Sequence, residues 1–292
     1  MKKVYMFPGQ GSQERGMGRR LFERFARQVE EASDALGYSL AELCLEDPRR
    51  ELARTEFTQP AVYVVNALAY LEKLEEAGRR PDYVAGHSLG EYDALFAAGA
   101  FDFMTGLLLV KRRGELMSRV GGGGMAAVVG LTPRSVGAVL ASEGLDSVID
   151  VANFNSYEQT VLAGPQEALA GARPLFERAG ARHFVALNVS APFHSRYLAG
   201  AEAEFERYLS GFTFSPPALA VLSNYRGRPY GAQEVRDNLA RQITHPVRWI
   251  ECVEHVLRED EVEFEEVGHG SVLTKLVQQI LARTPFAAPA HA

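Results

Sequence analysis

Short apolar runs alternate with amphipathic stretches along most of the chain, and this alternation predicts an α/β fold with a largely parallel sheet. Apolar positions that repeat every three or four residues predict helices, whereas short continuous apolar runs predict strands. In the first part of the chain these are a strand over Lys3–Phe7, helices over Leu21–Leu36 and Ala61–Leu74, a strand over Asp82–Ala85, and helices over Glu91–Ala98 and Phe103–Val120. The alternation ends with strands over Leu219–Ser223 and Glu263–Val267, a helix over Val272–Leu281, and an Ala- and Pro-rich tail from Pro285 that is expected to fray.

Four consecutive glycines, Gly121–Gly124, interrupt this alternation and predict a flexible joint between domains. The segment that follows has the order β-α-β-β-α-β, with elements over Met125–Leu131, Pro133–Glu143, Val148–Asn153, Gln159–Ala163, Glu167–Ala179 and His183–Val189. This order is that of a ferredoxin-like fold. We therefore expect a hydrolase-like α/β domain formed by residues 1–124 and 192–292, with a small ferredoxin-like subdomain, residues 125–191, inserted into it.

The pentapeptide Gly86–Gly90, with Ser88 at its centre, lies between a predicted strand and a predicted helix. A G-x-S-x-G sequence in that position is typical of a nucleophile elbow, a strained turn that exposes the serine hydroxyl. The flanking glycines are needed because a side chain there would collide with the crossing backbone. The helix that follows directs its N-terminus at the serine, where it stabilises negative charge. The pattern predicts a nucleophilic Ser88, although a serine between glycines also occurs in ordinary turns.

Composition and charge narrow the class of protein. The chain has 292 residues, 47% of them hydrophobic, and a net charge of −6, which are ordinary values for a globular enzyme. No run of basic residues is present, so nucleic acid is not expected as a partner. No apolar run reaches the ~18 residues of a membrane span, and we expect a soluble, cytoplasmic protein without a membrane partner. Cys44 and Cys252 match no metal-binding spacing and are expected to be buried, reduced thiols.

A serine nucleophile needs a base, and the chain has 7 histidines. His87 adjoins Ser88, and neighbouring side chains in an elbow point apart, so a structural role is expected for His87. His194 lies where the small subdomain would return the chain to the large domain. On spacing alone three others remain open as the base: His245, His255 and His269.

Six sequence blocks occur together and in order: Phe7–Gln13, Gly86–Tyr92, Arg113–Gly114, Asn153–Ser156, Phe193–Ser195 and Pro246–Trp249. With these blocks the chain, from residue 4 to about residue 281, resembles the malonyl-coenzyme A:acyl carrier protein transacylase family, including the discrete acyltransferases that serve polyketide synthases in trans. The resemblance implies that Ser88 becomes acylated and that His194 is its general base. It also implies an oxyanion hole formed by the backbone amides of Gln10 and Leu89, and a backbone carbonyl of Gln242 that orients the histidine.

Arg113 matches the arginine of this family that pairs with the free carboxylate of malonate. A guanidinium can bind a carboxylate through two hydrogen bonds, and an unpaired guanidinium in a dry pocket is unfavourable, so acyl groups without a carboxylate would be disfavoured. Helical spacing places Arg113 on one face with apolar neighbours: Leu109, Val110, Leu116 and Met117. The alternative is a solvated charge on the helix beside Lys111 and Arg112.

Two positions depart from the common pattern of the family. Phe193 stands where many members used in fatty-acid synthesis have serine. A bulky aromatic residue there resembles malonyl-selective polyketide acyltransferases and would crowd a methyl branch on the substrate. His269 stands between two glycines where proline is common, and we expect it to lie in a surface loop.

The resemblance implies an acyltransferase that moves a malonyl group from malonyl-CoA to the phosphopantetheine thiol of an acyl carrier protein through a malonyl-serine intermediate, in polyketide or fatty-acid biosynthesis. The alternative is a serine hydrolase, such as a proofreading enzyme for acyl thioesters, built on the same elbow. A non-catalytic module that docks carrier proteins is disfavoured by the intact set of Ser88, His194 and Gln10. No cofactor or metal is expected, because the coenzyme A thioester is a substrate and the acceptor carries the phosphopantetheine. We expect the protein to be a monomer.

Overall fold

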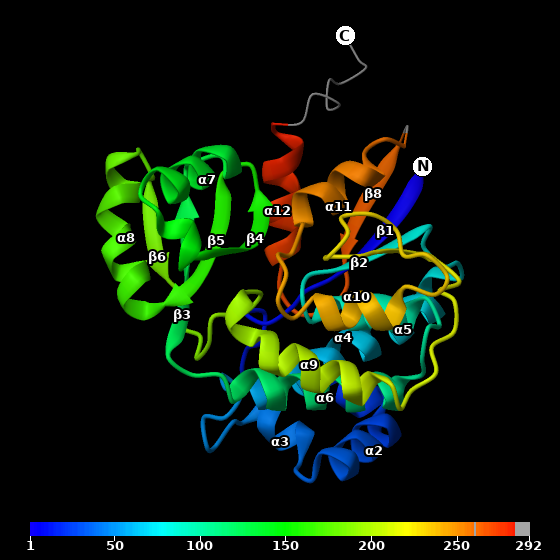
Figure 1. Cartoon of the computed structure of the whole chain (residues 1–292). Helices are drawn as coiled ribbons and strands as arrows, with labels where there is room; N and C mark the ends of the chain where they lie inside the picture. The colour runs from blue at the N-terminus through cyan, green and yellow to red at the C-terminus, as the bar shows by residue number, and fades with distance from the viewer. Residues whose placement is uncertain (260, 284–292) are drawn as a thin grey trace.

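Two four-stranded sheets, each covered by its own helices, form the part of the molecule that the structure describes (Figure 1). The computed structural model describes residues 1–259 and 261–283 of the chain. The first sheet is parallel and has the strand order β7-β2-β1-β8. Its strands are β1 (Lys2–Phe7), β2 (Tyr83–Gly86), β7 (Ala220–Leu222) and β8 (Val262–Glu266).

Helices bury both faces of the parallel sheet, and successive residues of β1 point alternately to one face and to the other. Tyr5 and Phe7 pack against one layer of helices, which includes α4 (Thr55–Ala77), α5 (Gly90–Ala97) and α6 (Phe103–Ser118). Val4 and Met6 point the other way, onto α11 (Trp249–Val256) and α12 (Val272–Leu281). Because both faces are covered, β2, β7 and the second half of β1 carry no charged residue, as expected for a parallel sheet, whereas the edge strand β8 has three glutamates.

The second sheet is antiparallel and belongs to the ferredoxin-like subdomain. Its strand order is β4-β5-β3-β6, with β3 (Gly123–Val129), β4 (Asp150–Ser156), β5 (Gln159–Pro165) and β6 (His183–Ala186). Ala126 and Val128 face α7 (Pro133–Ser142) and α8 (Gln166–Arg178), whereas Met125 and Ala127 join the core of the large domain. The predicted fold class, a parallel α/β sheet plus a ferredoxin-like subdomain, is confirmed; the residue limits of the two domains stay a prediction.

The subdomain is also tied to the large domain through strand-like pairing. The N–H of Phe154 donates to the carbonyl of Val247 at 2.9 Å, and the N–H of Val247 donates to the carbonyl of Ala152 at 2.9 Å. The segment that precedes α11 therefore extends the β4 edge of the second sheet. This pairing fixes the two sheets relative to each other at one side of the space between them.

The glycine run is less flexible than predicted. Gly123 and Gly124 are the first residues of β3 and pair with Pro165 and Gly164. A Cβ atom on Gly123 would lie 2.6 Å from Cγ of Pro192, so a glycine is needed there for close packing. The prediction of a four-residue flexible joint was therefore wrong for its second half.

Residues 21–36 form parts of two helices, α1 (Arg19–Arg24) and α2 (Ala26–Leu36), rather than one. Phe25 lies between them with φ −112° and ψ 40°, outside the helical region, and its side chain is buried. Both helices place apolar residues against the same core, so the apolar pattern continues through the break. The prediction of a single helix was wrong for this reason.

Helix α4 begins at Thr55, whereas the sequence predicted a start after Pro60. A proline inside a helix removes one N–H···O bond, but this helix is buried over most of its length and packing outweighs the lost bond. Strand β6 ends at Ala186, before the predicted end, and the chain leaves the sheet there. Four helices and two short 3₁₀ turns were not predicted: α3 (Leu40–Leu45), α9 (Ala199–Leu209), α10 (Val235–Arg241), α11, and the turns Leu145–Ser147 and Arg196–Leu198.

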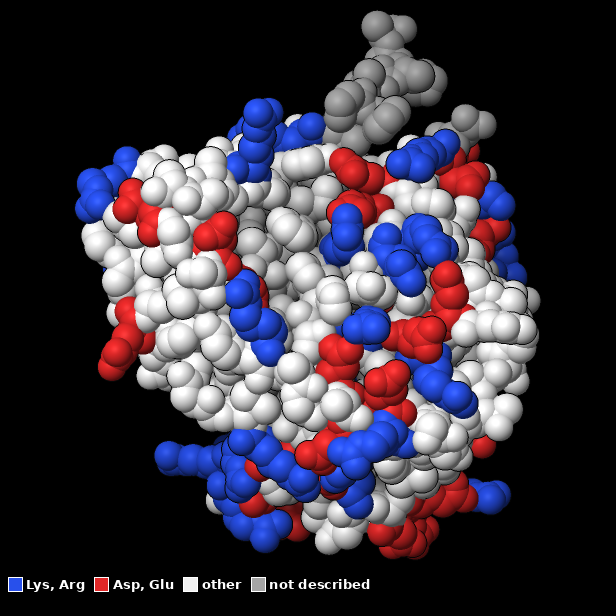
Figure 2. Space-filling model, viewed as in Figure 1, with Lys and Arg blue, Asp and Glu red and all other residues white. Residues whose placement is uncertain are grey.

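The described part of the chain contains no helix whose length and apolar character would let it cross a bilayer. On the face shown in Figure 2, basic and acidic side chains are interspersed rather than gathered by sign. The predicted tail from Pro285 lies outside the described residues.

Candidate active site

Ser88 lies on a sharp turn between β2 and α5. Its φ of 53° is in the left-handed region, which residues other than glycine rarely adopt. A Cβ atom on Gly86 would lie 1.9 Å from the carbonyl carbon of Gly90, and one on Gly90 would lie 2.0 Å from the carbonyl oxygen of Phe7. Both glycines are required for the chain to cross here, which was the predicted reason for the G-x-S-x-G sequence.

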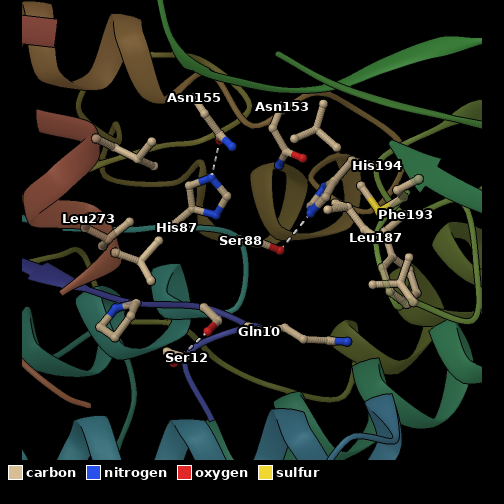
Figure 3. Close-up of a pocket in the computed structure, with 18 of the residues that line it drawn as sticks. Gln10, Ser12, His87, Ser88, Asn153, Asn155, Leu187, Phe193, His194 and Leu273 are labelled. Carbon is tan, nitrogen blue, oxygen red and sulfur yellow. Dashed lines mark hydrogen bonds between the residues drawn. The ribbon is translucent and has the colours of Figure 1, made fainter. Parts of the chain in front are cut away.

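Ser88, His194 and Gln242 form a hydrogen-bonded chain, of which Figure 3 shows the first link. Oγ of Ser88 lies 2.7 Å from Nε2 of His194, and Nδ1 of His194 lies 2.8 Å from the carbonyl oxygen of Gln242. A carbonyl only accepts, so Nδ1 carries the proton and Nε2 accepts from the serine hydroxyl. Burial, with a smaller contribution from the Arg113 cation, lowers the pKa of His194 to about 3. The imidazole is therefore neutral near pH 7. The backbone of His194, like that of Ser88, is in the left-handed region, with φ 57°.

The backbone amides of Gln10 and Leu89 lie where the loop after β1 crosses the elbow. A Cβ atom on Gly9 would lie 2.3 Å from the carbonyl oxygen of His87 and 3.6 Å from the nitrogen of Leu89, so only glycine allows this approach. Neither N–H of the predicted oxyanion hole donates to another described residue. The N-terminus of α5 adds partial positive charge at Leu89. Two free amides beside Ser88 are suited to bind a developing oxyanion.

Arg113 projects from α6 into the same site, with its side chain 1% exposed. Nη1 donates to Oε1 of Gln59 at 2.8 Å. Nη2 donates to Oε1 of Gln242 at 2.9 Å and to Oγ of Ser88 at 3.1 Å. The guanidinium lies 5.5 Å from the ring centre of Tyr92, over its face.

This buried guanidinium has no carboxylate partner within the described residues. Burial lowers the pKa of Arg113, because the charged form loses its hydration. The two basic neighbours on the helix differ: Lys111 donates to the carbonyl of Ala35, and Arg112 pairs with Glu115. The helical periodicity therefore placed Arg113 correctly on the inner face, and it is not a solvated charge.

A cleft of about 210 Å³ lies between the two sheets and contains Ser88. Phe193 lines this cleft beside His194 and is 6% exposed (Figure 3). Apolar lining side chains come from the second sheet, from the segment after β6, and from α6 and α12: Met125, Val161, Leu187, Val189, Met117, Val272, Leu273 and Leu276. Polar side chains also line the cleft, among them Asn153, Asn155 and Gln159. An acyl group on the serine would thus meet both apolar and polar side chains, with Arg113 as the cation.

Among the described histidines, His194 is the one that bonds to Ser88. His87 also lines the cleft, but Nε2 of its buried ring bonds to Oδ1 of Asn155 at 2.8 Å, and the ring packs 5.7 Å from Trp249. The other three considered as bases have different partners: His245 packs on Tyr225, His255 on Tyr83, and His269 bonds to Glu14. His269 lies in the loop between β8 and α12, with its side chain 36% exposed.

Three buried polar residues that the sequence analysis did not single out support the site. Asn224 accepts from the N–H of Ser88 at 2.6 Å and donates to the carbonyl of Gly86 at 2.7 Å, which fixes the elbow. Gln59 supplies an acceptor for Arg113, and Glu91 accepts from the side chain of Gln242. Asn224 lies two residues after the end of β7, and a polar residue at the carboxyl end of a parallel strand is a signal that could have identified it.

The described residues contain no group of three or more His, Cys, Asp or Glu side chains suited to a metal ion. What they bring together is a hydroxyl bonded to a neutral imidazole, two free amides and a buried cation. This set can form an ester on the serine, stabilise the oxyanion of each tetrahedral intermediate, and bind an acyl group that carries a carboxylate.

The parallel sheet, the elbow and the serine–histidine pair define an enzyme that carries out acyl chemistry on a serine. The chain belongs to the acyl transferase domain family, which matches residues 4–290. It is 51% identical over 282 residues to the polyketide biosynthesis malonyl CoA-acyl carrier protein transacylase BaeC of Bacillus velezensis, covering 96% of this chain and 97% of that protein. The family predicted from the sequence is thereby confirmed.

Solved structures of similar proteins share the whole fold. A malonyl CoA-acyl carrier protein transacylase from Burkholderia pseudomallei has a TM-score of 0.94 and 47% identity, with 98% of this chain and 99% of that chain covered. The malonyl-transacylase in a complex with its type II PKS acyl-carrier protein has a TM-score of 0.91 and 36% identity, with 97% and 94% covered.

Proposed function

We propose that this protein transfers a malonyl group from malonyl-CoA to the phosphopantetheine thiol of an acyl carrier protein, through a malonyl ester on Ser88. The observation that carries the proposal is the buried guanidinium of Arg113, which has no carboxylate partner among the described residues and donates from Nη2 to Oγ of Ser88 at 3.1 Å. A carboxylate at the far end of the acyl group would complete an ion pair there while its carbonyl reacts at the serine. The similarity to BaeC supports the same donor and acceptor and a place in polyketide biosynthesis.

In the first half-reaction Oγ of Ser88 attacks the thioester carbonyl as its proton passes to Nε2 of His194. The amides of Gln10 and Leu89 stabilise the oxyanion, and the carbonyl of Gln242 stabilises the imidazolium through Nδ1. The C–S bond then breaks, and the leaving thiolate takes the proton from His194. Free coenzyme A and the malonyl ester of Ser88 are the products.

In the second half-reaction the thiol of the carrier's phosphopantetheine gives its proton to His194 and attacks the ester carbonyl. The same two amides bind the second oxyanion. The C–O bond to Ser88 breaks, and Oγ regains the proton from Nε2. The donor thioester and the carrier-bound thiol are both substrates in this scheme, and no further cofactor takes part. Phe193 lies beside this acyl group and is proposed to limit branching at its α-carbon.

The alternative product is free malonate, formed if water instead of a thiol attacks the acyl-serine. Incubation with radiolabelled malonyl-CoA, with and without a carrier protein that bears phosphopantetheine, separates the two reactions. We expect a stable label on the protein that moves to the carrier. Release of the label as malonate at the same rate with and without carrier would support a hydrolase, and absence of labelling would contradict both. The monomeric state and the cytoplasmic location stay predictions.

A further inference from the structure

Glu91 is a buried carboxylate that none of the steps above uses. It lies in the first turn of α5, just after Ser88, and is 0% exposed. Oε1 accepts from the N–H of Asn224 at 3.2 Å and from the hydroxyl of Tyr230, and Oε2 accepts from the side-chain amide of Gln242. Both oxygens thus accept hydrogen bonds, and one of the three donors, Gln242, belongs to the active site.

Gln242 connects this carboxylate to Ser88, His194 and Arg113. Its backbone carbonyl accepts from Nδ1 of His194. Its Nε2 donates to Glu91 and, at 2.9 Å, to the carbonyl of Ser88. Its Oε1 accepts from Nη2 of Arg113 at 2.9 Å. A single side-chain amide therefore lies between the buried carboxylate and the buried guanidinium.

The two ends of a primary amide are similar in size, and their partners decide which end faces which way. An ionised carboxylate only accepts, so Glu91 requires the NH₂ end of Gln242 on its side. The oxygen end must then face Arg113, which only donates. The reversed amide would place two donors against each other at Arg113 and two acceptors against each other at Glu91, and buried unsatisfied polar groups are unfavourable.

We propose that Glu91 is a positioning residue for malonyl recognition, because it fixes the orientation of the Gln242 amide and thereby holds Arg113 beside Ser88. The inference rests on the proposed function and adds to it. Glu91 makes no direct contact with Arg113, and its negative charge acts on the guanidinium across Gln242. The cation is stabilised in this way, while the substrate carboxylate does not have to displace a protein carboxylate to reach it.

The ionised form of Glu91 orients the side-chain amide of Gln242. The test is therefore carried out at a pH at which Glu91 is ionised. Burial raises the pKa of Glu91 to about 7, and the hydrogen bonds from Tyr230 and Gln242 lower this pKa by a smaller amount. The other titratable groups around it are Tyr92 on α5, Arg113 on α6, Tyr230 after β7 and Cys252 on α11. Burial raises the pKa of the two tyrosines and the cysteine, so at about pH 8.5 they are neutral while Glu91 is ionised.

The substitution Glu91→Gln tests the proposal because the new side chain has the same shape as glutamate and should reverse the side-chain amide of Gln242. The new side chain must present its oxygen to Asn224 and Tyr230, which leaves its NH₂ facing Gln242. Gln242 then has to turn its own oxygen toward residue 91 and its NH₂ toward Arg113. Labelling of Ser88 by malonyl-CoA should fall about 10- to 100-fold relative to labelling by acetyl-CoA, as measured by mass spectrometry of the acyl-serine.

Tyr230→Phe is the matched control, since it removes another bond to the same carboxylate without touching Gln242. We expect it to keep the malonyl-to-acetyl ratio of the wild type at about pH 8.5. Equal losses of both donors in Glu91→Gln, or an unchanged ratio, would overturn the positioning role. If thermal melting shows that Glu91→Gln does not fold, Gln242→Met decides, because it removes the amide and keeps the backbone carbonyl; an unchanged ratio there also overturns the proposal. A wild-type protein that malonyl-CoA does not label would instead contradict the proposed function.

Discussion

Replacing Arg113 by methionine is expected to abolish the preference for malonyl over acetyl groups. The guanidinium is 1% exposed, so a malonyl carboxylate bound beside it would be almost fully removed from water. Without the cation that carboxylate would be buried and unpaired, which costs about 3–5 kcal/mol. This corresponds to a loss of roughly 10²- to 10⁴-fold in acylation by malonyl-CoA. Acetyl-CoA carries no carboxylate, so acylation by it should hold or rise.

Single-turnover labelling with each thioester measures both rates on the same protein. Arg112→Met is the control for removing a cation from this helix, because Arg112 pairs with Glu115 and Glu204 outside the cleft. The control should leave both rates close to those of the wild type. A loss that is equal for malonyl and acetyl donors in Arg113→Met would refute the reasoning, since it would show that Arg113 acts on Ser88 alone and that the carboxylate binds elsewhere.

Three further outcomes are expected. Ser88→Ala should acquire no covalent malonyl group by mass spectrometry, because alanine offers no nucleophile; a labelled variant would place the ester on another residue. The pKa of His194 falls from its usual 6.5 to about 3 on folding. The neutral imidazole therefore stabilises the fold above pH 6.5, and this contribution is lost as the pH falls from 6.5 toward 3. Melting curves should show a steeper loss of stability over this range for the wild type than for His194→Gln, and parallel curves would contradict the shift. Phe193→Ser should raise turnover of methylmalonyl-CoA relative to malonyl-CoA by roughly 10-fold, since one methyl against an aromatic side chain costs about 1–3 kcal/mol; a lower melting temperature with an unchanged ratio would show that Phe193 only packs the junction between the domains.

The parts of the site that could be predicted from the sequence are those with a local signature. The elbow at Ser88 is one turn between a strand and a helix, and its two glycines are needed because the backbone segments cross there without room for a side chain. The inward position of Arg113 follows from helical periodicity within α6. The geometry at His194 and Gln242 agrees with what the family resemblance implied, although spacing alone had left several histidines open.

The parts that could not be predicted depend on contacts between distant segments. Gln59 and Asn224 meet the site only because α4 and the end of β7 pack beside the elbow. The same holds for the secondary structure: burial keeps Pro60 inside a helix, and Phe25 breaks a helix whose apolar pattern is continuous. In these cases tertiary packing outweighs the local preference on which the predictions were based.

Ser88 and His194 both occupy left-handed backbone, with φ of 53° and 57°. For residues with a side chain this conformation is about 1–2 kcal/mol less favourable than the right-handed one. Contacts elsewhere in the fold must hold both residues in this conformation. The net stability of the protein is lower by this strain, in return for the positions of Ser88 and His194. Glycine would relieve the backbone strain at either position but would remove the hydroxyl or the imidazole, so the strain lies where the reactive groups have to be held.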